Sequence, residues 1–408
     1  MNAICLNFKV HQPYYYKKYH FFDIGVTHDY YDHSRNEEMI RRVSRSCYIP
    51  TNNMLLKLIE RYGDKLSFSM TISGTTMELL ENYAPDVLKS FQTLVSTGSV
   101  ELMSTPYYHS MAMVKSSDEF KCQVTQHQKK IKELFGVSCR NFANTDLIYA
   151  DYLGIILSEM GFRGVVTEGA KYVLGWRSPN YVYSNPIARN LKILFRNQQL
   201  SDDISLRFSN SYWAGYPLTA EKFSDWLCRD PNHKCVTIAM DYKVIGYYME
   251  RSSGIFGFFE NLPQTIFRNT DFKFLSPNTI FSYSDAVAPV YIPNEISWMS
   301  AERDISSWLG NDLQKDFFRK LYRLEESMKR INEPKLLEDW RRLQSVDNLF
   351  DMNFRWLNEH QFDVDNPQSP YEAYINNMNI LNDLEMRLQQ IRFSRMVIRN
   401  KLKNTVEV

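Results

Sequence analysis

The feature that most constrains the fold of this chain is an alternation of short apolar runs with helical patterns through its first two-thirds. The run Ala3–Val10 alternates apolar side chains as a strand does, and Val236–Met240 is apolar throughout apart from Thr237. Strands that alternate with helices are typical of parallel βαβ units, so we expect an α/β fold built on a seven-stranded (β/α)7 barrel. The predicted strands are Ala3–Val10, Leu66–Ile72, Val100–Met103, Asn141–Ala143, Gly164–Thr167, Lys192–Phe195 and Val236–Met240.

Helical spacing of apolar residues separates several of these strands, whereas the strand signals stop after about Ser300. The predicted barrel helices are Thr51–Tyr62, Asp86–Thr97, Ser117–Phe135 and Tyr152–Met160. The later amphipathic patterns are Leu313–Ile331, Lys335–Phe350 and Tyr371–Ile391. These patterns predict a C-terminal α-helical bundle. We therefore expect a barrel domain over residues 1–297 and an α-helical domain over residues 298–408.

Composition and short motifs exclude several classes of function. The net charge is +1, which gives no reason to expect a nucleic-acid or membrane partner. The six cysteines form no CxxC pair, and neither a secretory signal nor a membrane-spanning run is visible, so we expect a cytoplasmic protein. The chain has no GxSxG, Walker or HExxH motif and no GxGxxG after its first strand, and we predict no cofactor.

Two aspartates stand where barrel enzymes carry their catalytic groups. Asp146 follows the strand Asn141–Ala143, and Asp241 follows Val236–Met240. The active sites of parallel barrels lie at the carboxyl ends of their strands. Two carboxylates that face one pocket are the minimum equipment for cleaving a glycosidic bond. Asp146 alone can equally be a helix N-cap, so the pair carries the interpretation rather than either member.

Polar residues at other strand ends are candidate substrate contacts. His11 and Gln12 follow the first strand, where they can hydrogen-bond sugar hydroxyls or form a polar turn. Glu101 and His109 belong to the third strand and the segment after it, although Glu101 taken alone reads better as a solvent-facing residue. Asp203 follows the sixth strand near an arginine, which is typical either of a fixed carboxylate or of a surface charge pair.

A further candidate cluster lies at the junction with the helical region, where Trp298, Glu302 and Asp304 come close together in the sequence. An aromatic ring near a cleft can stack on the apolar face of a sugar, which favours a substrate-binding role. A helix start packed against the barrel is the alternative, and the sequence gives it about equal weight.

A metal-dependent deacetylase is a second class of enzyme that the sequence leaves open. His11, His28 and His109, with Asp29 or Asp32, include the residue types that bind zinc. Their spacing matches no known ligand pattern, and we predict no metal site.

Taken together and in order, these segments resemble glycoside hydrolase family 57, in its α-amylase-like branch. The resemblance covers nearly the whole chain, and its ordered set of motifs is specific although each fragment is short. The motifs are His11–Pro13, Gly98–Glu101, Tyr107–His109, Asn144–Tyr149, Leu200–Asp203, Met240–Tyr242, Ile296–Trp298, Glu302–Asp304, Trp308–Asn311 and Ser369–Asn376.

The resemblance implies a seven-stranded barrel followed by a helical bundle, and hydrolysis or transfer of α-linked glucose units with retention. It places the nucleophile at Asp146 and the general acid/base at Asp241, with an α-glucan or maltooligosaccharide as the partner. The family nucleophile is a glutamate, so Asp146 is one methylene shorter than the pattern requires. An error of about 1 Å in placing a reacting group can cost on the order of 10²-fold in rate.

Further departures lie at the predicted pocket. Lys243, Tyr247 and Tyr248 stand where the family carries acidic residues and a histidine. A cation beside a general acid favours its ionised form and opposes proton donation. The sequence therefore supports two hypotheses: a working α-glucan hydrolase or glucanotransferase with an atypical nucleophile, and a catalytically impaired relative that binds α-glucans.

Overall fold

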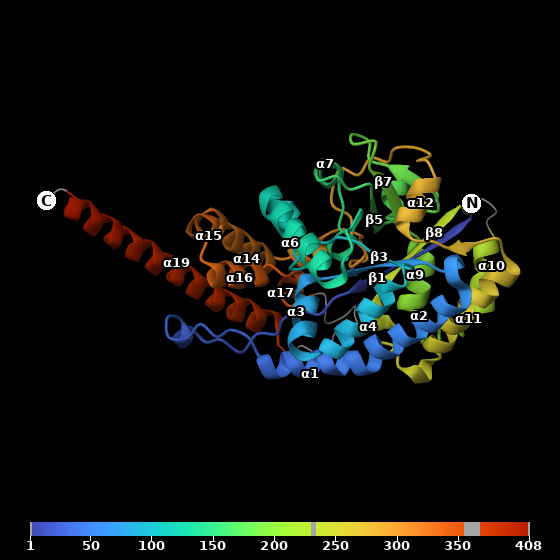
Figure 1. The fold of residues 1–408 in the computed structure, drawn as a ribbon, viewed down its shortest axis with the longest axis horizontal. Helices are drawn as coiled ribbons and strands as arrows, with labels where there is room; N and C mark the ends of the chain where they lie inside the picture. The colour runs from blue at the N-terminus through green and yellow to red at the C-terminus, as the bar shows by residue number, and fades with distance from the viewer. Residues whose placement is uncertain (1, 230–233, 355–367, 407–408) are drawn as a thin grey trace. The chain divides into compact units, whose positions relative to one another are not determined.

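The computed structural model describes residues 2–229, 234–354 and 368–406 (Figure 1). Two compact units make up the chain. The barrel unit comprises Met1–Gln12 and Glu37–Ile305, and the helical unit comprises Pro13–Asn36 and Ser306–Val408. The segment Pro13–Asn36, which follows the first strand, thus belongs to the same unit as the C-terminal helices.

Seven parallel strands form the barrel, as the sequence predicts. They are β1 (Ala3–Val10), β2 (Phe68–Ile72), β3 (Val100–Leu102), β4 (Asn141–Ala143), β5 (Gly164–Glu168), β7 (Lys192–Arg196) and β8 (Cys235–Asp241). Their order is β3-β2-β1-β8-β7-β5-β4. A parallel bridge between Ser104, just after β3, and Phe142 of β4 joins the two ends of this path. The predicted seven-stranded α/β barrel is confirmed.

Two short strands lie off this path and were not predicted. β6 (Val182–Ser184) pairs with β7 in the antiparallel direction, and β9 (Lys273–Phe274) pairs with the start of β1. β9 is two residues long, too short for alternation to reveal it, and the sequence did not indicate β6.

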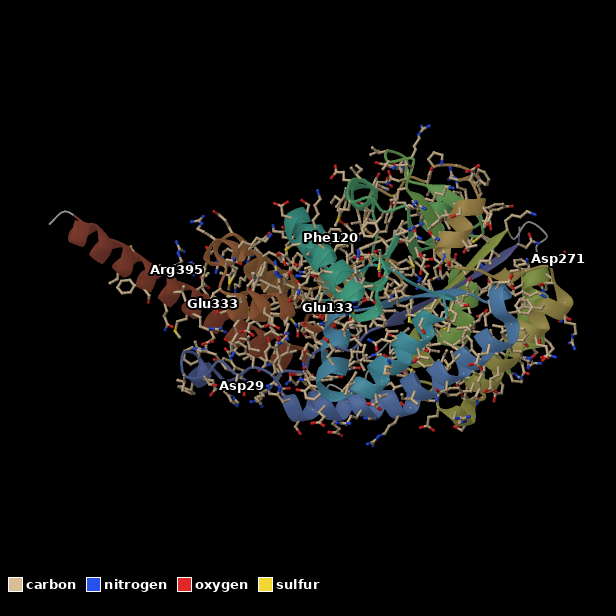
Figure 2. All side chains as sticks on the ribbon, viewed as in Figure 1. Asp29, Phe120, Glu133, Asp271, Glu333 and Arg395 are labelled. Carbon is tan, nitrogen blue, oxygen red and sulfur yellow. The ribbon has the colours of Figure 1, made fainter. Side chains whose placement is uncertain are left out.

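Helices cover the barrel between its strands (Figure 1). They include α1 (His33–Val43), α2 (Ile49–Tyr62), α3 (Gly74–Tyr83), α4 (Pro85–Ser96), α5 (Ala112–Lys115), α6 (Ser117–Phe135), α7 (Asp151–Glu159), α8 (Lys171–Leu174), α9 (Gln198–Ser205), α10 (Ala220–Cys228), α11 (Ile255–Asn269) and α12 (Pro277–Tyr283). α6 has the bounds that the sequence predicts, because Ser116 caps its start and Gly136, at φ 72°, ends it. Its Phe120, labelled in Figure 2, packs against Phe142 of β4 with 5.8 Å between ring centroids.

The barrel interior is filled mainly by small and apolar side chains. Ala3 and Cys5 of β1 pack there with Met103, Leu194 and Ala239, and each is at most 3% exposed. Polar chemistry is therefore expected at the carboxyl ends of the strands, as in other parallel barrels.

The helical unit contains more helices than the sequence predicts. They are α13 (Ser306–Leu309), α14 (Asp312–Arg323), α15 (Glu325–Ile331), α16 (Pro334–Arg342), α17 (Val346–Phe350) and α19 (Pro370–Val406). The predicted helix Lys335–Phe350 is two helices because Ser345 adopts an extended conformation, with ψ 136°. Trp340, fully buried, donates from Nε1 to the Leu321 carbonyl at 2.9 Å and ties α16 to α14. None of the helices in the described ranges is long and apolar enough to cross a membrane.

Candidate active site

The two predicted catalytic carboxylates meet at the carboxyl ends of β4 and β8. Asp146 lies in the turn after β4, and Asp241 is the last residue of β8. Lys9, near the end of β1, places its Nζ 2.7 Å from Asp146 Oδ1 and 3.3 Å from Asp241 Oδ2. These two oxygens are therefore no farther apart than the sum of the two distances.

The Asp146 carboxylate is held on several sides. Its Oδ1 accepts a hydrogen bond from Trp298 Nε1 at 3.0 Å, and its Oδ2 lies 3.3 Å from His109 Nε2. His109 in turn stacks on His11, with ring centroids 3.8 Å apart. The Asp146 side chain is only 4% exposed. The structure thus brings the predicted residues His11, His109 and Trp298 together around Asp146.

Neighbouring charges determine the protonation state of the Asp146 carboxyl group. Burial alone would raise the pKa of Asp146, but the charges of Lys9 and His109, and their hydrogen bonds, hold that pKa well below its usual range. Burial would likewise lower the pKa of Lys9, but Asp146 and Asp241 outweigh burial and raise it. Asp146 is therefore an ionised carboxylate and Lys9 a charged ammonium at neutral pH.

The backbone around the site is strained. Positive φ is costly for residues other than glycine, and such residues cluster at functional sites. In the described ranges five of them have a φ of this kind. Four belong to this region: His109 at 52°, Asp146 at 44°, Leu147 at 56° and Arg303 at 59°. Ser297 supports the turn of Asp146, since its Oγ donates to the Asp146 carbonyl at 2.9 Å.

A second group of charges lies beside the first. Arg196, at the end of β7, contacts Glu168 of β5 at 3.1 Å and Asp202 of α9 at 2.6 Å. Arg303 contacts the other oxygen of Asp202 at 2.7 Å. The ring of Trp298 stands between the groups, with its centroid 5.3 Å from the Arg196 guanidinium and 5.2 Å from Lys9 Nζ.

Two of the predicted substrate-binding residues, Asp203 and Glu101, are directed elsewhere. Gln12 is buried, and its backbone N–H donates to Thr76 Oγ1 at 2.7 Å. Asp203 pairs with Arg207 at 2.7 Å, so its neighbour Asp202 is the residue that reaches the Trp298 region. Glu101 accepts hydrogen bonds from Asn141 Nδ2 at 2.6 Å and from the backbone N–H of Asn278 at 2.7 Å.

The depth of Glu101 in the barrel follows from the strand register. Glu101 pairs with Ser69, whereas Lys9 pairs with Thr71, two residues farther along β2. Glu101 therefore lies below the level of the carboxylate pair, and the structure does not bring it to Asp146.

The junction residues take separate positions. Glu302 is exposed, and Ser300 Oγ donates to Asp304 Oδ1 at 3.2 Å. No group of three or more His, Cys, Asp and Glu side chains in the described part of the chain is arranged to hold a metal ion. Of the histidines considered as ligands, His11 stacks on His109, whereas His28 in the helical unit pairs with Asp383 at 2.8 Å.

The segment after Asp241 is held in place from outside the barrel. It packs on a π-helical turn, Ser44–Tyr48, where Cys47 Sγ donates to the Tyr242 carbonyl at 3.2 Å. Gly246 has φ 100°, and a Cβ there would lie 2.2 Å from the Ser46 carbonyl oxygen, so only glycine fits. The backbone N–H of Lys243 donates to Asp241 Oδ1 at 2.9 Å, and its ammonium lies over the Tyr248 ring.

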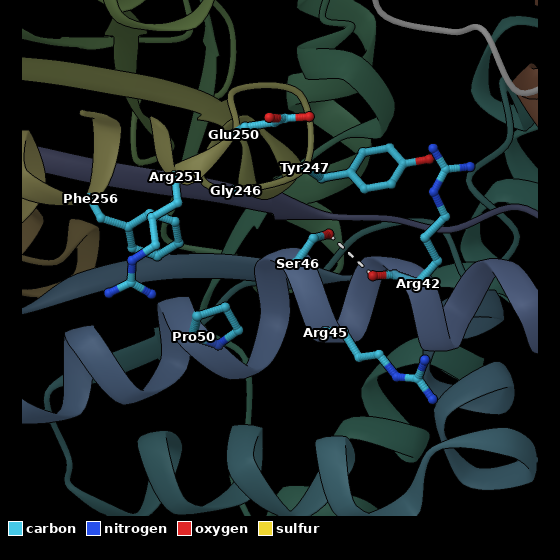
Figure 3. A pocket seen from close by; sticks show the side chains of 9 residues that line it. All are labelled: Arg42, Arg45, Ser46, Pro50, Gly246, Tyr247, Glu250, Arg251 and Phe256. Carbon is cyan, nitrogen blue, oxygen red and sulfur yellow. Dashed lines mark hydrogen bonds between the residues drawn. The ribbon is translucent and has the colours of Figure 1, made fainter. Parts of the chain in front are cut away.

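A cavity of about 420 Å³ borders this segment (Figure 3). Figure 3 shows Arg42 beside Tyr247, whose ring centroid is 5.5 Å from the guanidinium. The lining residues are Arg42, Arg45, Ser46, Pro50, Gly246, Tyr247, Glu250, Arg251 and Phe256. Tyr247, which the resemblance places at the predicted pocket, is among them, whereas none of the predicted catalytic and substrate-binding residues is.

Comparison with known proteins identifies the family. Residues 5–296 match glycosyl hydrolase family 57. The chain belongs to this family. A Methanocaldococcus jannaschii protein named "Putative alpha-amylase" is 35% identical over 404 residues, which are 95% of this chain and 85% of that protein.

Solved structures place the same fold in family 57 enzymes. The branching enzyme of Thermococcus kodakaraensis has a TM-score of 0.70 at 12% identity, over 95% of this chain and 90% of that one. The 4-alpha-glucanotransferase of Thermococcus litoralis has a TM-score of 0.61 at 14% identity, over 86% of this chain. This family 57 chain spans 54% of that glucanotransferase. At these identities the likeness supports the fold and leaves the reaction open.

Sequence reasoning missed four charged residues of the site: Lys9, Glu168, Arg196 and Asp202. Lys9 and Arg196 stand at or near the end of a predicted strand, on the face that points into the barrel. A charged residue at the end of an otherwise apolar strand was the available signal. To recognise such a residue as part of the site, one must know that both faces of each barrel strand are buried.

Proposed function

We propose that this family 57 chain acts on α-linked glucans with retention, as a hydrolase or a glucanotransferase. Asp146 is the nucleophile and Asp241 the general acid/base. The observation that carries the proposal is the meeting of these two carboxylates, from β4 and β8, on one ammonium group. The names of the compared proteins, which include an alpha-amylase, a branching enzyme and a 4-alpha-glucanotransferase, support the substrate class.

The roles follow from the surroundings of each carboxylate. Asp146 is ionised and its oxygens are oriented by Trp298 and His109, which suits a nucleophile that attacks an anomeric carbon. Asp241 is more exposed, with 16% of its side chain accessible, which suits a group that exchanges protons with the leaving sugar and then with water. The same carboxyl gives a proton in the first step and removes one from water in the second.

The remaining site residues keep predicted roles in substrate binding. His11, His109 and Trp298 surround the nucleophile and are proposed to contact the glucosyl unit next to it. Gln12, Glu101, Asp203, Glu302 and Asp304 stay predictions, as do the cytoplasmic location and the lack of nucleic-acid and membrane partners.

The test is turnover of maltoheptaose and glycogen by the purified protein. We expect shortened or lengthened glucan chains by chromatography, with the α-anomer formed first by proton NMR. Asp146→Asn and Asp241→Asn should each reduce the rate by at least about 10²-fold, because each removes one half of the acid–nucleophile pair. Asp225→Asn, at an exposed position on α10, is the matched control and should leave the rate unchanged. Equal rates in wild type and both site variants would overturn the assignment.

A second function is favoured by one specific observation. The ion pair with Lys9 requires Asp241 to be ionised, whereas the general-acid step requires it to carry a proton. A family 57 member in which this pair persists would bind α-glucans without cleaving them. Calorimetry would then show maltoheptaose binding, and chromatography would show no product over a long incubation. Product formation by the wild type that both Asp variants abolish would exclude this alternative.

A further inference from the structure

Lys9 occupies an unusual position for a lysine. Its side chain leaves β1 on the face that points into the barrel, and its ammonium lies between Asp146 and Asp241. The ring of Trp298 forms a third side, with its centroid 5.2 Å from Nζ. Two carboxylates and an aromatic face are the groups with which proteins bind a cation. Lys9 supplies that cation from within the chain.

The same position has a meaning in glycoside chemistry. In a retaining glycosidase the sugar ring lies between the nucleophile and the acid/base, and positive charge develops at its anomeric carbon in the transition state. A cation held between the two carboxylates therefore stands where that charge would appear.

We propose that Lys9 is a resident occupant of the glucosyl subsite, and that a sugar must displace its ammonium to reach Asp146. The inference rests on the proposed roles of Asp146 and Asp241. It adds that the subsite is closed to cationic glucose analogues while Lys9 is in place. Lys9 is thus a residue that determines which ligands enter, and it takes no part in bond cleavage.

Displacement is physically feasible. The Lys9 side chain is 18% exposed, so its flexible four-carbon stem can turn its ammonium to water. The carboxylates would remain supported after it leaves, because Trp298 and His109 hold Asp146 and the backbone N–H of Lys243 holds Asp241. Departure of the ammonium leaves two negative charges facing one space, which attracts a cationic ligand.

The test uses 1-deoxynojirimycin, a glucose analogue that carries a positive charge on its ring nitrogen. Calorimetry should detect weak binding to the wild type and binding at least about 10-fold tighter to Lys9→Met, because removal of the resident cation opens the subsite. Lys9→Arg keeps the charge and should bind as weakly as the wild type. Lys121→Met removes a lysine of α6 that pairs with Glu159 outside the site, and its affinity should stay within about 3-fold of the wild type.

Tight binding of the iminosugar to the wild type, equal to that of Lys9→Met, would overturn the inference. If thermal unfolding shows that Lys9→Met does not fold, Lys9→Gln takes its place in the same comparison with the wild type. Maltoheptaose titrated into the same proteins tests the proposed function separately. Absence of maltoheptaose binding to all of them would contradict the substrate class, while the iminosugar comparison would still decide the role of Lys9.

Discussion

Two groups of charged side chains lie on either side of Trp298, and they differ in their balance of charge. Around Arg196, two guanidinium groups face two carboxylates, those of Glu168 and Asp202. Around Lys9, one ammonium faces two carboxylates. The first group has two guanidinium groups for two carboxylates, whereas the second has one ammonium, with the His109 imidazole 3.3 Å from Asp146.

The two groups also differ in burial. In the first, Glu168, Arg196 and Asp202 are at most 5% exposed and Arg303 is 13% exposed. In the second, Asp146 is 4% exposed, but Lys9 and Asp241 are 18% and 16% exposed. A closed and balanced group holds its charges in place and supports the fold. An open group in which one ammonium faces two carboxylates can take up a proton or a ligand, as an acid–base site must. From this comparison we propose a structural role for the Arg196 group and a chemical role for the Lys9 group.

The largest expected effect comes from breaking the balanced group. Arg196→Met leaves Glu168 and Asp202 without this partner in a buried site, and should lower the free energy of unfolding by about 3–5 kcal/mol. Lys9→Met should cost less than about half as much, because water reaches Asp241 and because Trp298 and His109 still hold Asp146. Urea denaturation at pH 7 measures both. Similar losses in the two variants would contradict the distinction between the groups.

The free energy of unfolding also depends on pH, and His127 of α6 contributes to this dependence. Burial lowers the pKa of this histidine to about 4, against about 6.5 in an unfolded chain. Between these values the unfolded chain binds a proton that the folded protein does not, so stability falls as the pH is lowered. His127→Gln should remove about 2 kcal/mol of the loss between pH 7 and pH 5, measured by urea denaturation at both values.

The control for this prediction is the wild type under the same conditions. An unchanged loss of stability in His127→Gln would show that other groups control this range.

Asp146 affects stability at lower pH. Its depressed pKa contributes stability above about pH 4, and this stability is lost as the pH falls further. Comparisons of Lys9 with Arg196 are therefore cleanest near pH 7.

The smallest expected effect concerns Trp298, which separates the two groups. Trp298→Phe keeps an aromatic ring beside Lys9 but removes the hydrogen bond to Asp146 Oδ1. One such bond to a charged group contributes roughly 1.5–3 kcal/mol. Because other partners remain on Asp146, we expect the transition state to lose about 1 kcal/mol of stabilisation. We expect a decrease of about 5-fold in kcat/KM with maltoheptaose and little change in stability. A loss as large as that of Asp146→Asn would mean that Trp298 does more than orient the nucleophile.

The sequence was a good guide to the barrel and a partial guide to the site. The alternation of apolar residues in Ala3–Val10 predicted β1, and every residue of that strand except Lys9 is buried. Short pairings such as β9 could not be predicted, since they depend on backbone contacts made by the finished fold. The carboxylate pair was predictable because chain order and strand ends together determine where Asp146 and Asp241 lie.

Side-chain direction was the part that sequence could not supply. Asp202 and Asp203 are adjacent on α9, and their directions differ by about 100° around the helix axis, so one meets Arg196 and the other Arg207. The sequence does not indicate Lys9 as a site residue, because the alternation in β1 marks one apolar, buried face and leaves Lys9 on the other. In a closed barrel the opposite face is also buried, which places Lys9 inside the ring of strand ends.

The central claim is that Asp146 is the nucleophile of a retaining reaction on glucosyl substrates. The most direct test is to trap the covalent intermediate with 5-fluoro-α-D-glucosyl fluoride and to locate it by mass spectrometry of peptides. The account predicts one glucosyl adduct on Asp146, formed faster in Lys9→Met than in the wild type and not formed in Asp146→Asn. An adduct on another carboxylate, or none in either protein that carries Asp146, would contradict it.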